Sequence, residues 1–147
     1  MTDARQLERE ALASIAATSK ISLDELASLP AYTGQKPNTD CVYDGSLIEL
    51  SHFPPVLAKS GGELIVGILG PFWDRVFRIH FSGVKAVSLA GFGSSISMDI
   101  SDIVLEPTQS DERCCTIQGL FFNSTITVTY TSAFVLRQVL QSPVQRN

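Results

Sequence analysis

The two histidines of this 147-residue chain, His52 and His80, are the first candidates for catalysis. His80 lies in RVFRIHF, which alternates as a β-strand does and places His80 on the same face as Arg78. A catalytic histidine needs a nucleophile or acid held beside it, and no Ser, Cys or Asp adjoins His80. His52 ends an expected strand, and two distant histidines without further ligands do not make a zinc site. The pattern favours a structural role for His80.

A glycine-rich stretch, AGFGSS at residues 90–95, is the next candidate, because glycines let backbone N–H groups approach a phosphate. A dinucleotide-binding fingerprint needs a third glycine, a preceding buried strand and a following helix. Here the glycines precede ISMDISDIV, whose apolar residues recur with the period of a strand. We interpret the stretch as a hairpin loop or bulge. The chain also lacks G-x-S-x-G, a Walker lysine and H-E-x-x-H, so no motif indicates an enzyme.

Cysteine usage and charge restrict the remaining possibilities. Cys41, Cys114 and Cys115 form an odd set without C-x-x-C spacing, which predicts buried or inert thiols in a cytoplasmic protein. The longest apolar run, ELIVGILGPFWD, is too short to span a bilayer. The net charge of −4 argues against nucleic-acid binding and against attachment to anionic membranes, which both need basic surfaces. We expect neither a cofactor nor a metal site.

The elements that position these residues differ between the two ends of the chain. Residues 3–29 are expected to be helical, because apolar side chains recur at four-residue spacing from Leu7 to Ile15. Ser22 and Glu25 match a capping box, which predicts the start of a second, shorter helix. The turn formers that follow, up to residue 40, separate this helical segment from a strand-rich remainder.

Beyond residue 40 the apolar period changes to that of strands, with runs such as SLIEL, ELIVGIL and STITVTYT. Successive strands without intervening helices predict an antiparallel sheet. We expect one α+β domain, residues 1–147, in which N-terminal helices (1–30) pack on a mostly antiparallel β-sheet of five to seven strands (41–141). The side chains expected to be buried are Leu7, Ile15, Leu26, Ile65, Phe77, Ile79, Phe81, Val87, Leu89, Ile103, Ile126 and Val128.

The most distinctive surface feature is an asymmetry of charge. Between residues 86 and 112 there is no lysine or arginine. The same stretch contains five carboxylates, Asp99, Asp102, Glu106, Asp111 and Glu112. Such a cluster steers a basic partner and raises its association rate. The alternative is a solvated loop that only keeps the protein soluble, and the spacing does not match a calcium-binding loop.

Aromatic residues at expected turns are candidates for the apolar part of an interface. The only tryptophan, Trp73, follows Pro71 and Phe72, where a ring is hard to bury completely. Exposed rings of this kind anchor protein interfaces, although a tryptophan that covers the end of a sheet is more common. We predict a partner-binding surface in which the five carboxylates face a basic protein and Trp73 or Phe92 supplies the anchor.

The order of strands and turns carries a resemblance to a known class of proteins. DGSLIEL at residues 44–50 precedes an apolar strand, then FRIHFSGVKAVSLAGFG at residues 77–93, an acidic strand and a polar-alternating strand. Over residues 42–131 this order resembles sheet-rich immunity proteins of bacterial polymorphic-toxin systems, with an early aspartate-led strand and a later F-x-G-V turn. Tyr43 and Asp44 stand where that group has a His-Asp pair, and the N-terminal helices are additional. The resemblance implies a stoichiometric inhibitor that caps a toxin.

Three functional hypotheses remain open at this point. The first is an immunity-type protein that binds and neutralises a cognate bacterial toxin through direct contact. The second is a small acidic adaptor or secretion chaperone, which would form a groove for an extended client protein. The third is an enzyme of unrecognised type, which would need a pocket that brings His80 together with an aspartate or a cysteine.

Overall fold

The computed structural model describes residues 5, 6, 9, 15–53, 62–93, 97–107, 111–120 and 123–144. Of these residues 62% lie in strands and 8% in helices, and no helix among them reaches seven residues. The expected α+β architecture, with N-terminal helices packed on one sheet, is therefore wrong. The described chain folds as antiparallel β-sheets joined at a corner.

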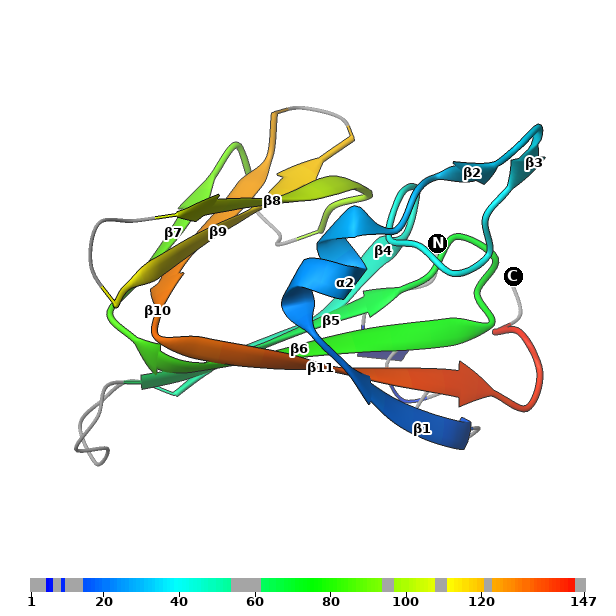
Figure 1. The fold of residues 1–147 in the computed structure, drawn as a ribbon, viewed down its shortest axis with the longest axis horizontal. Helices are drawn as coiled ribbons and strands as arrows, with labels where there is room; N and C mark the ends of the chain where they lie inside the picture. The colour runs from blue at the N-terminus through cyan, green and yellow to red at the C-terminus, as the bar shows by residue number, and fades with distance from the viewer. Residues whose placement is uncertain are drawn as a thin grey trace.

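The larger sheet has five strands in the spatial order β1-β11-β6-β5-β4 (Figure 1). Its strands are β1 (Ile15–Ile21), β11 (Ser132–Leu140), β6 (Arg75–Val84), β5 (Gly62–Leu69) and β4 (Ser46–Phe53). Every neighbouring pair is antiparallel. β6 lies at the centre, which explains why its apolar face, Phe77, Ile79 and Phe81, is buried as the alternation predicts.

The smaller sheet has four strands in the order β7-β10-β9-β8, also antiparallel throughout. These strands are β7 (Ala86–Ala90), β10 (Thr125–Tyr130), β9 (Arg113–Gly119) and β8 (Ile100–Pro107). A separate two-stranded hairpin, β2 (Tyr32–Thr33) with β3 (Lys36–Pro37), projects from one end of the molecule (Figure 1). The described strands therefore exceed the expected five to seven and form two main layers instead of one.

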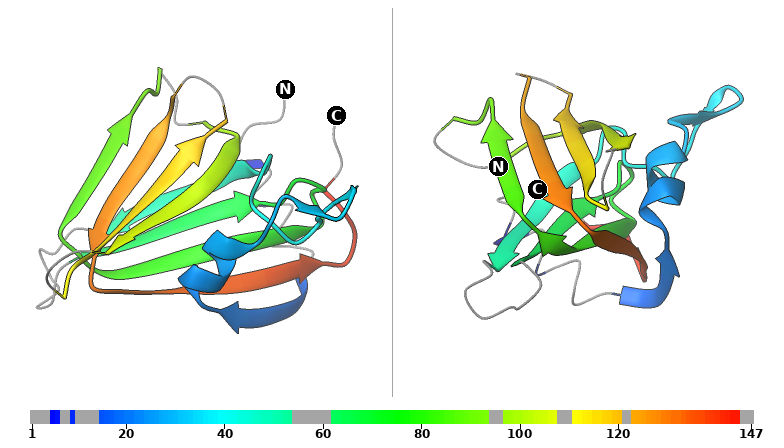
Figure 2. Two further views of the ribbon diagram at one scale, coloured as in Figure 1. Left: turned by 45° about the horizontal axis from the view of Figure 1, so that its top comes forward. Right: turned by 60° about the vertical axis from the view of Figure 1, so that its left-hand side comes forward.

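The two main sheets share a corner, because β6 continues into β7 and β10 continues into β11 (Figure 2). Ser82 pairs with Ser132 and Ala86 with Thr129, so three residues on one strand oppose two on the other. Gly83 has φ +63° within this bulge, a left-handed conformation that glycine adopts without steric cost. A bulge of this kind bends both strands, which is how strands change sheets in orthogonally packed β-proteins.

A short helix, α2 (Leu23–Ser28), lies between β8 of the smaller sheet and β11 of the larger one (Figure 1). It contacts β8 of one sheet and β11 of the other, and it buries Leu23 and Leu26 in the common core. The Ser22 hydroxyl accepts a hydrogen bond from the Glu25 backbone N–H at 3.0 Å, which confirms the predicted N-cap.

The helical segment expected over residues 3–29 is interrupted by a strand. Residues 15–21 form β1, which pairs with β11 at the edge of the larger sheet, from Ile15 opposite Leu140 to Ile21 opposite Val135. The described residues before it, Arg5, Gln6 and Arg9, are helical. Backbone pairing with an exposed sheet edge therefore outweighs the weak helical spacing of this segment.

The main core lies between the two sheets and includes most of the side chains expected there. Leu26, Phe77, Ile79, Phe81, Ile103, Ile126 and Val128 are buried, as predicted. Ile15, Ile65 and Val87 are only half-buried, and Leu7 lies outside the described residues. Leu89 is 42% exposed because β7 is an edge strand of its sheet, so the prediction for Leu89 is wrong.

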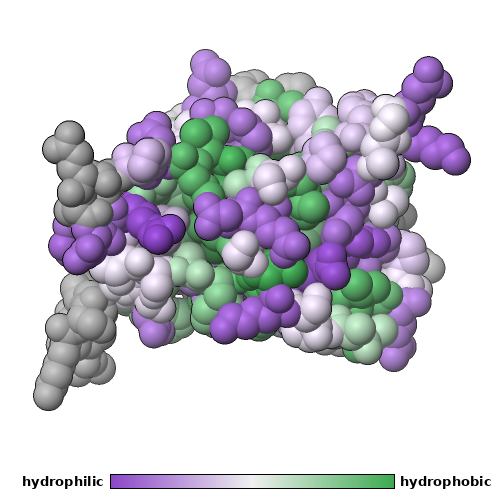
Figure 3. Space-filling model, in the orientation of Figure 1, coloured by the Kyte–Doolittle hydropathy of each residue, from purple (hydrophilic) through white to green (hydrophobic). Residues whose placement is uncertain are grey.

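A second, smaller apolar cluster contains Ile48, Leu69, Val76, Leu140 and Val144. Trp73 packs against it from the turn between β5 and β6, and the Val144 backbone N–H donates to the Trp73 carbonyl oxygen at 2.7 Å. Figure 3 shows hydrophobic areas interspersed with hydrophilic ones on the face seen in Figure 1. Among the described residues, no helix has the length and apolar character needed to cross a membrane.

Candidate functional site

His80 lies on the face of β6 that points away from the main core, together with Arg78, as the alternation predicts. Its ring stacks on Phe134 of β11 with centroids 4.7 Å apart and planes 5° from parallel. Burial lowers the pKa of His80, and the Arg78 guanidinium lowers it further, which favours the neutral ring. The buried Nε2 atom of His80 has no hydrogen-bond partner among the described residues.

The predicted carboxylates fall on and around β8, an edge strand of the smaller sheet. Asp99, Asp102 and Glu106 are exposed, whereas Ile100 and Ile103 between them are buried. Their exposure alternates with burial because the register shifts between Ile100 and Asp102, which keeps the carboxylates on the outer face. No ion pair engages these three carboxylates within the described part of the chain. We call Asp99, Asp102 and Glu106 the acidic edge.

The other two predicted carboxylates lie at the far end of β8. Asp111 is exposed, and Glu112 forms an ion pair with Lys85 at the corner between the sheets. Glu106 and Glu112 line a pocket of about 350 Å³ with Asp24 of α2 and with Arg113. Lys85 and Arg113 partly neutralise this end, so the uncompensated negative charge lies toward Asp99 and Asp102.

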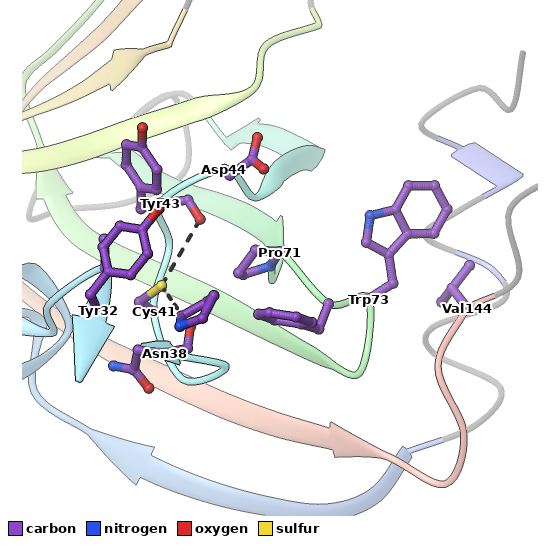
Figure 4. Close-up of a pocket in the computed structure, with 11 residues that line it drawn as sticks. Tyr32, Asn38, Cys41, Tyr43, Asp44, Pro71, Trp73 and Val144 are labelled. Carbon is purple, nitrogen blue, oxygen red and sulfur yellow. Dashed lines mark hydrogen bonds between the residues drawn. The ribbon is translucent and has the colours of Figure 1, made fainter. Parts of the chain in front are cut away.

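A second pocket, of about 480 Å³, lies at the opposite end of β8 (Figure 4). We call it the aromatic pocket. Three exposed rings line it, Tyr32 at 58%, Tyr43 at 39% and Phe72 at 46% exposure. They come from β2, from the loop before β4 and from the β5–β6 turn. Only five large hydrophobic side chains are exposed in the described chain, and three of them meet here.

The backbone of the aromatic pocket is strained at two positions. Asp44 has φ +63° and Trp73 has φ +60°, and both residues line the pocket. The left-handed region costs a non-glycine residue roughly 1–2 kcal/mol. Only one other described non-glycine residue, Asn123, has a positive φ. Strain of this kind gathers at binding and catalytic sites, so its location supports a functional assignment of this pocket.

An ion cluster fixes the loop that forms one wall of the aromatic pocket. Asp40 accepts from Arg75 at 3.0 Å and from Arg137 at 2.7 Å, and Arg75 also pairs with Asp74 at 3.1 Å. These contacts join the loop to β6 and β11, so Cys41, the next residue, is held in a buried position. Asp40 and Asp74 therefore compensate the charges of both guanidinium groups, although the buried Nε of Arg137 has no hydrogen-bond partner among the described residues.

The acidic edge begins beside the aromatic pocket. The Asp44 backbone N–H donates to the Ile100 carbonyl oxygen at 2.7 Å, and the Ile100 N–H donates to the Gly45 carbonyl oxygen at 2.8 Å. Asp99 also forms a β-bridge with Ser46. The pocket and the acidic edge therefore form one continuous surface, which the sequence could not reveal because residues 44–46 and 99–100 meet only in the fold.

The two aromatic residues that the sequence singled out lie differently. Trp73 packs against the smaller apolar cluster, and Figure 4 shows it beside Val144, on the side of the aromatic pocket away from Tyr32 and Tyr43. Phe92 is half-buried and packs against the main core. The exposed rings of the aromatic pocket are Tyr32, Tyr43 and Phe72. The sequence drew attention only to Phe72, in the predicted turn, and to Tyr43, where the resembling group has a histidine.

The three cysteines differ in accessibility, which predicts different reactivities. Cys41 and Cys115 are buried and Cys114 is half-buried on β9. Burial raises the pKa of Cys41, and it raises the pKa of Cys115 to about 12. We expect the half-buried Cys114 thiol to react promptly with a chromogenic disulfide at pH 8. The Cys115 thiol should react on the order of a hundredfold more slowly. Equal rates for all three thiols in the folded protein would contradict this burial.

Among the described residues, no group of three or more His, Cys, Asp or Glu side chains is arranged to hold a metal ion. The candidate site consists of exposed rings, carboxylates without an ion-pair partner in the described part of the chain, and residues with positive φ. The chain matches no protein-family model, no curated protein sequence and no solved structure.

Proposed function

We propose that this chain is an immunity-type protein that neutralises a cognate bacterial toxin in the cytoplasm by binding it directly. The proposal assigns it no catalytic activity. The observation that carries it is the acidic edge, where Asp99, Asp102 and Glu106 are exposed and have no cation partner among the described residues. The resemblance in strand order to immunity proteins agrees with this role.

The electrostatics of the acidic edge favour a basic protein as the partner. Residues 86–112 contain no lysine or arginine, so the carboxylates of β8 are not screened by neighbouring cations on the same stretch. A surface whose charges all have the same sign concentrates the electrostatic potential. It therefore raises the rate of encounter with an oppositely charged protein. Toxins that act on nucleic acids need basic surfaces, and an acidic inhibitor would cover such a surface.

The aromatic pocket supplies the apolar part of the proposed interface. Interfaces take most of their binding energy from a few aromatic or arginine contacts that exclude water, surrounded by polar residues. Tyr32, Tyr43 and Phe72 are exposed beside the acidic edge, where they would be desolvated by a bound protein. Charge would thus accelerate association, and the rings would slow dissociation.

The proposal is tested with a variant that carries Asp99→Asn, Asp102→Asn and Glu106→Gln. Exposed carboxylates contribute little to stability, so we expect the thermal unfolding midpoint to stay nearly unchanged. Association with the cognate toxin, sought among the products of neighbouring genes, should slow by roughly tenfold at low ionic strength, with a weaker salt dependence. Stopped-flow or biosensor kinetics at two ionic strengths measure both effects.

A double variant, Glu25→Gln with Glu63→Gln, serves as the control, because both residues are exposed but lie outside the acidic edge. It should associate almost as fast as the wild type. If the triple variant associates at the wild-type rate, the acidic edge has no part in recognition. If no toxin encoded beside the gene binds the chain, the immunity assignment is wrong.

A further inference from the structure

The aromatic pocket has the composition of a receptor for a cation. Tyr32, Tyr43 and Phe72 expose ring surface to it, and the exposed Asp44 stands at its rim. Aromatic faces attract cations through their quadrupole, and a carboxylate beside them adds a charge-assisted hydrogen bond. Neither feature alone defines a ligand, but together they select a positively charged group with a flat or apolar body.

The local charges leave Asp44 available for such a ligand. Arg75 and Arg137 are both bonded to Asp40 of this loop, and Arg75 is also bonded to Asp74. No cation pairs with Asp44 anywhere in the described chain. Asp44 also keeps a left-handed backbone conformation at this rim, which costs conformational energy. Such strained residues are often found at binding sites.

We infer that the aromatic pocket receives an arginine side chain, with its guanidinium against the tyrosine rings and paired with Asp44. Arginine fits better than lysine because its planar group stacks on rings, is weakly hydrated and pairs with a carboxylate through two parallel bonds. The inference rests on the proposed function in one respect, since the arginine belongs to the basic partner. A pocket of about 480 Å³ is within the usual range for a bound ligand group.

The test uses the folded chain and a small probe, N-acetyl-arginine-amide, with N-acetyl-citrulline-amide as the neutral probe of nearly equal shape. Trp73 is the only tryptophan and lines the pocket, so its fluorescence reports occupancy. We expect the arginine probe to change the fluorescence saturably, and the citrulline probe to bind at least about fivefold more weakly.

Two variants locate the binding site. Asp44→Asn keeps the shape of the side chain and tolerates the left-handed backbone, so it should fold normally and bind the arginine probe about fivefold or more weakly. Tyr43→Ala removes an exposed ring and should weaken binding similarly while keeping the fold. Glu63→Gln changes an exposed carboxylate on β5 that does not line the pocket, so this variant should bind the arginine probe as the wild type does.

Equal binding of both probes, unchanged binding by Asp44→Asn, or no saturable response would each overturn the inference. Failure here is distinguishable from failure of the proposed function. A chain that neutralises a toxin but ignores the arginine probe would overturn the pocket assignment alone. A chain that binds the probe but no toxin would overturn the immunity assignment alone.

Discussion

Replacing Gly83 with alanine is expected to lower the free energy of unfolding by about 2–5 kcal/mol. Gly83 has φ +63°, and a Cβ atom there would lie 2.0 Å from the Thr131 hydroxyl oxygen, well inside contact distance. The left-handed backbone costs a non-glycine residue roughly 1–2 kcal/mol, and overpacking adds about 1–3 kcal/mol. Urea unfolding followed by circular dichroism measures the loss.

Gly34→Ala is the matched control, because Gly34 has φ +67° but no atom within 4 Å of its Cβ position. It should lose only the backbone cost, roughly 1–2 kcal/mol. Thr131→Gly should destabilise the wild type more than it destabilises Gly83→Ala, since it removes the clash. Equal losses for Gly83→Ala and Gly34→Ala would mean that the corner tolerates a side chain.

The second large effect is expected for Ile79→Ala, with a loss of about 2–5 kcal/mol in the free energy of unfolding. Ile79 is fully buried in the main core on the central strand β6. The loss combines the transfer of apolar surface with the cavity that remains, because the strands around Ile79 are held by pairing on both sides.

Ile65→Ala on the neighbouring strand β5 controls for the register. Ile65 is half-buried and pairs with His80 on the face away from the main core. Ile65→Ala should therefore lower the free energy of unfolding by about half as much as Ile79→Ala, or less. The reason is that folding removes less of the Ile65 side chain from water. A larger loss of unfolding free energy for Ile65→Ala than for Ile79→Ala would mean that the opposite face of the sheet forms the core.

The parts of the fold that the sequence predicts correctly are those with a strong local pattern. The alternation of β6 assigns Phe77, Ile79 and Phe81 to the core, and the Ser22 cap marks the start of α2. β1 has no such pattern, since residues 16–20 are all exposed and the strand forms only because β11 offers it an edge. Long-range pairing of this kind leaves no local trace, which is why a helix was predicted there.

The same distinction applies to the candidate site. The carboxylates of the acidic edge stand out in the sequence because they are close together and lack neighbouring cations, and their role in binding stays a prediction. The aromatic pocket was missed because Tyr32, Tyr43 and Phe72 come from three segments that meet only after folding. Trp73 is half-buried, in agreement with a ring that is hard to bury completely at a turn, and it packs against a small apolar cluster on the outer face of the larger sheet.

The order in which the strands are synthesised has a consequence for folding in the cell. β6 pairs with β5, made just before it, and with β11, where Ser82 meets Ser132 and Val76 meets Gln138. Until β11 leaves the ribosome, one edge of β6 stays unpaired beside a largely apolar face. Unpaired edges of that kind attract other chains. A ribosome stalled between the codons for β6 and β11 should therefore yield nascent chains that bind chaperones strongly.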